Sequence, residues 1–316
     1  MNLHQFRFIQ EAVRRNLNLT EAARALHTSQ PGVSKAIIEF EEELGIEIFE
    51  RHGKRIRRVT EPGQEVLRSI EIILREVANL KRIGEQFSKQ DAGTLSIATT
   101  HAQARYFLPG PVAALRQAYP GVQVVLHQGL PSQVARMLLD DVADIGLATE
   151  SLSEHEGLVT LPCYEWQHVM VVPEGHPLAQ VSRPTLEQLA AHPLVLYHPT
   201  VTGRTRIDQA FARARLSPAV ALEAFDSDVI KTYVRVGLGV GVVAEHAARE
   251  EAQPGSGLVV IPVGHLFGPN VARVAFKRGA YLRQFVLAFA GSLSPRLTPE
   301  AVRAAMTGIP GSDYQL

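Results

Sequence analysis

The spacing of apolar residues changes at about residue 91, and this change constrains the fold more than any other feature. Before it, apolar residues recur every three or four positions, which predicts amphipathic helices. After it, short apolar runs alternate with helical stretches, which predicts an α/β domain with a parallel sheet. The runs expected to be strands are GTLSIAT, QVVLH, ADIGLAT, HVMVV, PLVLY, GVGVV and LVVIPV. Residues 91–316 hold enough elements for two lobes with a cleft between them.

This pattern also sets the expected domain boundaries. A chain of 316 residues exceeds what one compact core usually needs. We expect a small helical domain with a hairpin at residues 1–60, one long helix at 61–90, and the α/β domain at 91–316. Within that domain, the expected lobes are about 91–163 together with 267–316, and about 164–266.

The first 45 residues predict three short helices. Thr20 is the expected N-cap of the second helix, and Ser29 that of the third. Pro31 falls in the first turn of the third helix, where its missing N–H costs nothing, and Gly45 is expected to end it. Two helices joined by a short turn, the second beginning with polar side chains, are the sequence form of a helix-turn-helix. An ordinary capped helix in a small helical domain is the alternative.

A helix-turn-helix reads DNA with the first turns of its second helix, which enter the major groove. Gln30 can pair with adenine edges, while a serine or lysine there can reach bases or phosphates. The predicted DNA contacts on this helix are Ser29, Gln30, Pro31, Ser34 and Lys35.

The stretch RHGKRIRR (51–58) holds five Lys or Arg residues and no acid. It predicts a basic hairpin, with Gly53 at its tip, that lies along the DNA backbone as a wing. The phosphate-neutralising residues expected there are Arg51, Lys54, Arg55, Arg57 and Arg58. The formal net charge of the chain is zero, so this local run carries the argument for DNA; a solvated charged face is the alternative.

Residues 61–90 predict a helix with a heptad seam, flawed only by a glycine. The seam residues are Val66, Ile70, Ile73, Val77, Leu80, Gly84 and Phe87. A seam on a helix that projects from a small domain needs a partner, and a second copy of the chain is the simplest one. A dimer would suit a two-fold symmetric operator. The alternative is a helix packed on its own C-terminal domain.

Polar residues follow several predicted strands of the α/β domain, where open α/β sheets bind ligands. Thr99 and Thr100 end the first strand and Gln103 opens the next helix, while Thr149 and Thr202 follow later strands. Hydroxyls, amides and helix N-termini together can hold a small anion. Each threonine taken alone could equally be a simple N-cap.

No catalytic or metal-binding motif is visible in the sequence, and we expect no cofactor. GLGVGVV (237–243) follows a helix and enters a strand, the reverse of a nucleotide loop, so it predicts a helix end. The twelve histidines show no metal spacing. The single cysteine, Cys163, fits a reducing compartment, and the absence of a signal peptide or of about 20 consecutive apolar residues fits the cytoplasm.

The stretch TEAARALHTSQPGVSKAIIEFEEELGIEIFER resembles the winged helix-turn-helix of LysR-type transcriptional regulators. Further blocks are similar to the CysB-like subfamily, which activates genes of sulfur assimilation and cysteine biosynthesis. These blocks are ATTHAQARYFLPG, LHQGLPSQ, LATE, LPCYEW, TGR and DVIKTYVRVGLGVGV. The resemblance covers nearly the whole chain.

The resemblance implies a two-lobed, periplasmic-binding-protein-like effector domain and a homodimer or homotetramer that binds double-stranded promoter DNA and RNA polymerase. It implies an acetylserine as inducer and sulfate or thiosulfate as a possible opposing anion. The ligand positions it implies are Thr100, Ala102, Gln103, Thr149 and Thr202, with Ala102 standing where CysB-like proteins usually have threonine. Regulation of alkanesulfonate or other sulfur-source genes is one alternative, a nucleoid-type structural DNA binder is a second, and an enzyme is a third.

Overall fold

The computed structural model describes residues 1–53, 55–88, 92–149, 152–201, 203–253 and 255–308. The chain divides into two compact units, Met1–Gly84 and Glu85–Leu316, which we call unit 1 and unit 2. Across the described ranges, no helix has both the length and the hydropathy needed to cross a bilayer.

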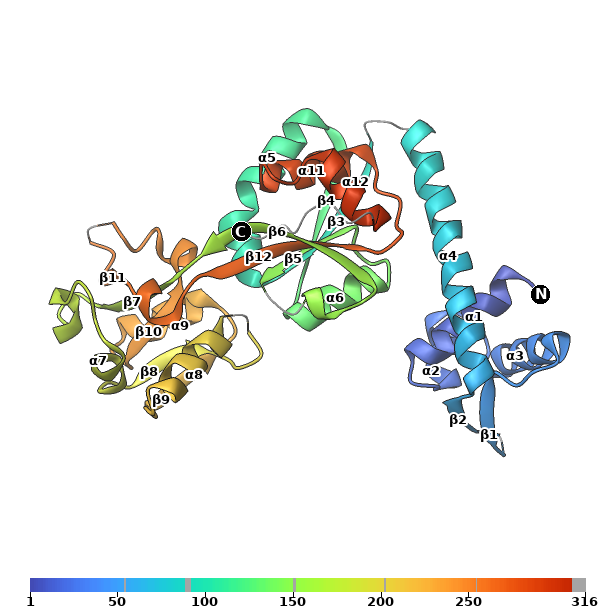
Figure 1. Cartoon of the computed structure of the whole chain (residues 1–316), viewed down its shortest axis with the longest axis horizontal. Coiled ribbons are helices and arrows are strands. Elements are labelled where there is room, and N and C mark those ends of the chain that lie inside the picture. The colour runs from blue at the N-terminus through green and yellow to red at the C-terminus, as the bar shows by residue number, and fades with distance from the viewer. Residues whose placement is uncertain (54, 89–91, 150–151, 202, 254, 309–316) are drawn as a thin grey trace. The chain divides into compact units, whose positions relative to one another are not determined.

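Unit 1 is built from helices around a small apolar core, with a hairpin beside it (Figure 1). Its elements are α1 (Leu3–Arg14), α2 (Leu19–Ala25), α3 (Gln30–Leu44), β1 (Phe49–His52), β2 (Arg55–Val59) and most of α4 (Glu61–Ser88). The periodic apolar residues of all three short helices meet in this core, where Ile9, Ile37 and Phe40 are buried. The edge of the Phe6 ring contacts the Phe40 ring at a centroid distance of 5.6 Å.

The helix ends follow local capping chemistry, with one difference from prediction. Ser29 caps α3, its hydroxyl accepting a hydrogen bond from the Gly32 N–H at 3.3 Å, and Gly45 ends that helix at φ +71°, as predicted. The expectation that Thr20 caps α2 is wrong. Asn18 is the cap, because its side-chain oxygen accepts from two N–H groups of the first turn, and the helix begins at Leu19.

The predicted hairpin is confirmed: β1 and β2 pair antiparallel, and Gly53 at the turn has φ +61°. Glycine is favoured there because an L side chain would crowd the backbone at positive φ. Thr60 then joins the hairpin to α4. Its hydroxyl donates to the Glu47 carbonyl at 2.6 Å and accepts from the Gly63 N–H at 2.9 Å.

Unit 2 consists of two lobes, each built on a five-stranded sheet. The first lobe has the sheet order β4-β3-β5-β12-β6. Its elements are β3 (Ala92–Thr99), the π-helix η1 (Gln103–Phe107), α5 (Pro109–Ala118), β4 (Gly121–Gln128), α6 (Pro131–Leu139), β5 (Ile145–Thr149), η2 (Leu152–Glu154), β6 (Leu158–Trp166), β12 (Asn270–Lys277), α11 (Gln284–Leu293) and α12 (Pro299–Thr307). Helix α11 is buried along most of its length because it is apolar on nearly every face.

The second lobe has the sheet order β11-β7-β10-β8-β9. Its elements are β7 (His168–Pro173), η3 (Pro177–Gln180), α7 (Leu186–Ala190), β8 (Leu194–Tyr197), α8 (Arg204–Arg213), β9 (Val220–Ala224), α9 (Ser227–Arg235), β10 (Val240–Ala244), η4 (Glu245–Ala248), β11 (Leu258–Pro262) and α10 (Gly264–Phe267). The GLGVGVV stretch ends α9 and enters β10, as predicted, with Gly237 at φ +80°.

Both sheets are mixed, which corrects the expectation of a parallel sheet. In the first lobe β12 runs antiparallel to β5 and β6, and in the second β7 runs antiparallel to β10 and β11. These antiparallel strands have a structural reason. Strands β6 and β12 belong to the first sheet and extend toward the second lobe, so the chain passes out on one and returns on the other (Figure 1).

Aromatic and histidine side chains fill the region where the chain passes between the lobes. His168 is fully buried between Trp166 and Phe267, and His246 lies near Trp166 at a centroid distance of 5.7 Å. Burial lowers the pKa of His168 to about 3 and that of His246 to about 4. Both imidazoles are therefore neutral in the folded protein at neutral pH.

These two histidines predict that unit 2 loses stability in mild acid. Below pH 6.5, both histidines are protonated in the unfolded chain. In the folded chain the pKa of His246 is lowered to about 4 and that of His168 to about 3, so both stay neutral until the pH reaches those values. The free energy of unfolding should fall by about 1.4 kcal/mol per pH unit for each histidine. Trp166, the single tryptophan, reports urea unfolding by fluorescence. A His246→Gln variant should show a visibly shallower slope, and an identical slope would contradict the prediction.

Candidate functional site

The predicted DNA-contacting residues of α3 lie at its N-cap and in its first two turns. Their side chains are exposed or partly exposed, so another molecule can reach them: Ser29, Gln30, Pro31, Ser34 and Lys35. The Lys35 side chain is 79% exposed and lies 3.6 Å from Glu39, a weak surface pair that phosphate can displace. Whether these residues contact bases stays a prediction.

Helix α3 and the β1–β2 hairpin share one surface hollow. Gln30 of α3 and Arg55 of β2 both line it, together with the turn before α2, and its volume is about 490 Å³. Arg55 and Arg57 are exposed, and Arg58 pairs with Glu50 at 2.5 Å. Lys54 lies outside the described residues. The Gln30 amide, predicted to read bases, and the Arg55 guanidinium, predicted to bind phosphate, thus lie on one side of unit 1.

Arg51 differs from the other wing arginines because it is tied into the fold. Its guanidinium lies 2.6 Å from the carboxylate of Glu41, which is nearly buried. The same carboxylate accepts hydrogen bonds from the Ile48 and Phe49 N–H groups at 2.9 and 3.0 Å. This cluster fixes the angle between α3 and the wing. A DNA contact by Arg51 stays a prediction.

The seam of α4 divides into two parts. Val66 and Ile70 pack into the core of unit 1, while Ile73 is 39%, Leu80 69% and Phe87 73% exposed. Exposed apolar residues at these intervals along one helix are an expected surface for a partner helix.

A cavity of about 390 Å³ opens between the two lobes of unit 2. The first lobe contributes Thr100, His101, Gln128 and the start of α6, and the second contributes Val201, Phe225 and Asp226. Thr100 comes from the end of β3 and Asp226 from the end of β9, so the cavity lies at the carboxyl ends of parallel strands.

Among the described residues of the predicted set, Ala102, Gln103 and Thr149 do not line this cavity. Gln103 is buried, and its side-chain oxygen accepts a hydrogen bond from the Tyr164 hydroxyl. Thr149 is also buried, and its hydroxyl accepts from the Trp166 indole N–H at 3.0 Å. Ala102 is partly exposed at the start of η1, and Thr202 lies outside the described residues. Of the predicted set, the structure places Thr100 on the cavity wall.

Asp228 of α9 connects the two lobes. Its carboxylate accepts a hydrogen bond from the Tyr106 hydroxyl at 2.6 Å and pairs with Arg105 at 2.9 Å, both on the first lobe. On its own lobe it pairs with Lys231 at 3.2 Å. Burial raises the pKa of Asp228, but the hydrogen bonds from Tyr106 and Lys231 and the nearby cations outweigh burial and hold it below the usual value.

Lys231 anchors this connection in the second lobe. Its ammonium is buried, donates to the Ala247 carbonyl at 2.7 Å and pairs with Glu251 at 2.9 Å. Burial lowers the pKa of Lys231, but the hydrogen bonds to Glu251 and Tyr106 more than reverse this and raise it above the usual value. Asp228 and Lys231 are therefore both charged at neutral pH. We call the set Arg105, Tyr106, Asp228 and Lys231 the lobe clasp.

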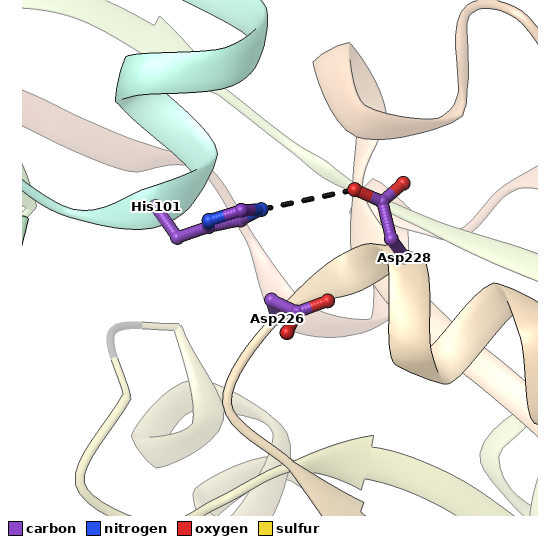
Figure 2. Close-up of side chains that lie close together, drawn as sticks. All are labelled: His101, Asp226 and Asp228. Atoms are coloured by element: carbon purple, nitrogen blue, oxygen red, sulfur yellow. Dashed lines mark ion pairs between the residues drawn. The ribbon is translucent and has the colours of Figure 1, made fainter.

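His101, Asp226 and Asp228 converge beside the clasp, as Figure 2 shows. A nitrogen of His101 lies 3.7 Å from an oxygen of Asp228, the pair marked by the dashed line. The spacing of the three groups would allow a metal ion. The Asp228 carboxylate, however, already carries two cationic partners and a hydroxyl donor, so this arrangement suits an ion-pair network better than a metal centre.

Several of these residues were missed by sequence reasoning. Asp226 and Phe225 follow β9, a strand that the apolar pattern did not predict because its side chains are mostly exposed. The rule that ligand residues follow strands would have found them had that strand been recognised. The clasp residues carry no such signal, because they meet across 122 positions of sequence.

Comparison with known proteins agrees with this geometry. Residues 3–64 match the family described as bacterial regulatory helix-turn-helix protein, lysR family, and residues 88–298 match the LysR substrate binding domain. The chain is 54% identical over 98% of both chains to the HTH-type transcriptional regulator CysB of Burkholderia cenocepacia. It is 47% identical to the regulator SsuR of the same organism, over 94% of this chain and 96% of SsuR.

A solved structure gives the same result for unit 2. The crystal structure of the cofactor-binding domain of the Cbl transcriptional regulator is 43% identical to this chain, covers 68% of it and 93% of the solved chain, and superposes with a TM-score of 0.65. These relatives are named as regulators of transcription and not as enzymes. Two family domains in the expected order and relatives aligned along nearly the full length leave one conclusion: the chain belongs to the LysR family of DNA-binding transcriptional regulators.

Proposed function

We propose that this protein regulates genes of sulfur assimilation and cysteine biosynthesis in the cytoplasm, in response to a small ligand such as an acetylserine. The observation that carries the proposal is the 54% identity to a CysB regulator along 98% of the chain. Identity at this level includes the lobes as well as the DNA reader, so it bears on the signal and not only on the fold.

The proposed DNA contact is made by α3 and the wing together. Gln30 reads a base edge, and Ser29, Pro31, Ser34 and Lys35 surround it, while Arg55 and Lys54 neutralise phosphates. The exposed seam residues of α4 pair with a second copy, which brings two readers to a two-fold operator, and a homotetramer follows from two such dimers. RNA polymerase is the proposed partner at activated promoters.

The proposed signal is a change in the distance between the lobes. A ligand in the cavity of about 390 Å³ touches both lobes and so favours whichever lobe arrangement it fits better. Through the oligomer, that preference changes the spacing of the readers on DNA. Sulfate or thiosulfate could oppose the inducer by favouring the other arrangement.

Footprinting upstream of the organism's own sulfur genes tests the proposal. We expect protected half-sites one or more helical turns apart, with a pattern that shifts when acetylserine is added. Absence of protection at physiological salt would refute the proposal.

The similarity to SsuR favours a second candidate, control of genes for alkanesulfonates or another sulfur source. Footprints on those promoters in place of the cysteine-biosynthetic ones would select it. A nucleoid-type structural binder is a third candidate, and it should give no heat in calorimetry with acetylserines, sulfate or sulfonates.

Two substitutions should separate base reading from backbone contact. Gln30→Ala should weaken operator binding by about 1–3 kcal/mol and leave random DNA nearly unaffected. Arg55→Ala should weaken binding to both and reduce the slope of affinity against salt by about one unit. Fluorescence anisotropy with operator and random duplexes at several salt concentrations measures both effects. Arg68→Ala, which removes an exposed arginine of α4, is the matched control, and equal losses on random DNA for Gln30→Ala and Arg55→Ala would contradict the assignment.

A further inference from the structure

The lobe clasp consists of two halves that differ in how firmly they are held. In the second lobe, the Lys231 side chain is 3% exposed and pairs with Glu251 at 2.9 Å and with Asp228 at 3.2 Å. It also donates a hydrogen bond to the Ala247 carbonyl at 2.7 Å. These partners all belong to the second lobe, so Lys231 and Asp228 stay paired whether or not the first lobe is in contact with them.

The first-lobe half is more accessible to water. The Arg105 side chain is 50% exposed, and that of Asp228, with which it pairs, is 35% exposed. The Tyr106 hydroxyl donates to Asp228 at 2.6 Å and accepts from Lys231 at 3.2 Å. Burial and the hydrogen bond to Asp228 raise the pKa of Tyr106, so the hydroxyl keeps the proton that it donates. Water can replace these partners when the lobes separate, so the clasp can open and close reversibly.

Tyr106 belongs to a segment that is fixed within the first lobe. Arg105 and Tyr106 are part of the π-helix η1, a rare form of helix that is often found at functional sites. Tyr164 of β6 holds both ends of this segment. Its hydroxyl donates to the Gln103 side-chain oxygen, and its ring stacks on the Phe107 ring at a centroid distance of 4.1 Å. The position of Tyr106 therefore follows the position of the first lobe.

Both halves of the clasp lie next to the cavity between the lobes. Thr100 and His101 line the cavity and come just before η1 in the chain. Asp226 also lines it and is the N-cap of α9, two residues before Asp228. Figure 2 shows His101 beside the two aspartates. A change in the width of the cavity therefore changes the distances across the clasp.

We propose that the lobe clasp is a reversible latch that holds unit 2 in the lobe arrangement of this structure without needing a ligand to close it. Tyr106 and Asp228 are its positioning residues, since theirs is the shortest contact of the clasp across the lobes. When the Tyr106 hydroxyl leaves Asp228, an arrangement with the lobes farther apart gains population. The latch itself is a property of the fold, and its effect on DNA rests on the proposed function.

The distance between the lobes, measured by pulsed electron paramagnetic resonance on the full chain, tests the inference. Spin labels are attached at Arg303→Cys on α12 of the first lobe and Gln209→Cys on α8 of the second, both exposed positions. Cys163 is the single cysteine of the chain and is buried, so the reagent reacts with the introduced thiols. Labelled chain is mixed with an excess of unlabelled chain, so that an oligomer holds at most one label pair.

We expect Tyr106→Phe, without any ligand, to raise the population of a second, longer distance about tenfold relative to the wild type. The change removes one hydrogen bond to a charged group and leaves the aromatic ring in place. Asp228→Asn should act in the same direction. Adding Tyr106→Phe to Asp228→Asn should have a clearly smaller effect than Tyr106→Phe alone, because the two side chains contact each other. Urea unfolding followed by Trp166 fluorescence checks that each variant is folded.

Tyr119→Phe removes a hydroxyl at the end of α5, outside the clasp, and is the matched control. It should give the wild-type distances. Wild-type distances in Tyr106→Phe, or strictly additive effects of Tyr106→Phe and Asp228→Asn, would overturn the latch and leave the proposed function standing.

Footprinting with the same variants and no added ligand tests the consequence for DNA. We expect the pattern of protection by Tyr106→Phe on the operator to differ from that of the wild type, and the pattern of Tyr119→Phe to match it. A changed lobe distance with an unchanged footprint would support the latch and overturn the proposed signal, so the two failures are distinguishable.

Discussion

Replacing Glu41 with alanine should unfold much of the DNA-reading unit. The carboxylate is nearly buried, accepts hydrogen bonds from the Ile48 and Phe49 N–H groups and pairs with Arg51. Alanine would leave two buried N–H groups and a half-buried guanidinium without their acceptor. We expect a loss of about 3–5 kcal/mol in the free energy of unfolding of unit 1. Because a domain of this size has little stability to spare, operator binding should disappear with it.

Hydrogen exchange at the Ile48 and Phe49 amides, together with operator binding by anisotropy, measures this loss. Glu42→Ala is the matched control, since Glu42 is the next residue of α3 and is exposed. It should change stability by no more than about 0.5 kcal/mol. Glu41→Gln keeps a neutral acceptor oxygen and should fall between the two. Similar exchange rates in Glu41→Ala and Glu42→Ala would show that the cluster does not hold the wing.

Replacing Lys231 with methionine should destabilise unit 2 by a similar amount, about 3–5 kcal/mol, because it breaks a buried ion pair from one side. The Lys231 side chain is 3% exposed, and its removal leaves Glu251, 5% exposed, with Arg235 as its remaining cationic partner among the described residues. It also removes a donor from the Ala247 carbonyl and a cation from Asp228. Urea unfolding followed by Trp166 fluorescence measures the change.

The double variant Lys231→Met with Glu251→Met tests the cause. Removing both charges leaves no isolated carboxylate opposite the new methionine, so the double variant should lose less stability than the two single variants added together. Strict additivity would mean that the two side chains act independently and that the pair is not the source of the loss.

The helix-turn-helix was predictable because its signals are local. Ser29, Pro31 and Gly45 determine where α3 begins and ends through groups within a few residues of themselves. The turn at Gly53 likewise follows from backbone sterics at one position. The error at α2 has the same local scale: Asn18 and Thr20 are both good caps, and the choice between them depends on which residue takes the extended conformation before the helix.

Unit 2 was predictable only in outline. Fully buried strands such as β5 and β10 are continuous apolar runs and were recognised, whereas β9 at the sheet edge is mostly exposed and was not. Strands β6 and β12 were not among the predicted strands, although both are largely buried. The direction of β12 depends on pairing with β5 and β6, more than a hundred residues earlier in the chain. For the same reason, the pairing of Gln103 with Tyr164 and of Thr149 with Trp166 could not be predicted from the sequence, and the ligand contacts of Gln103 and Thr149 stay predictions.

The sequence by itself determined the order of the domains, the helix ends of the DNA reader and the chemical character of the groups available. Those properties depend on neighbours along the chain, whose interactions are set by spacing alone. The tertiary structure decided which polar groups are satisfied within the fold and which face the cavity. It joined Asp228 to Tyr106 across the lobes and placed Asp226, which caps α9, on the cavity wall, although the two aspartates are two residues apart. The physical reason is that the electrostatic energy of a charged side chain depends mainly on groups within a few ångströms, and it is folding that brings those groups together.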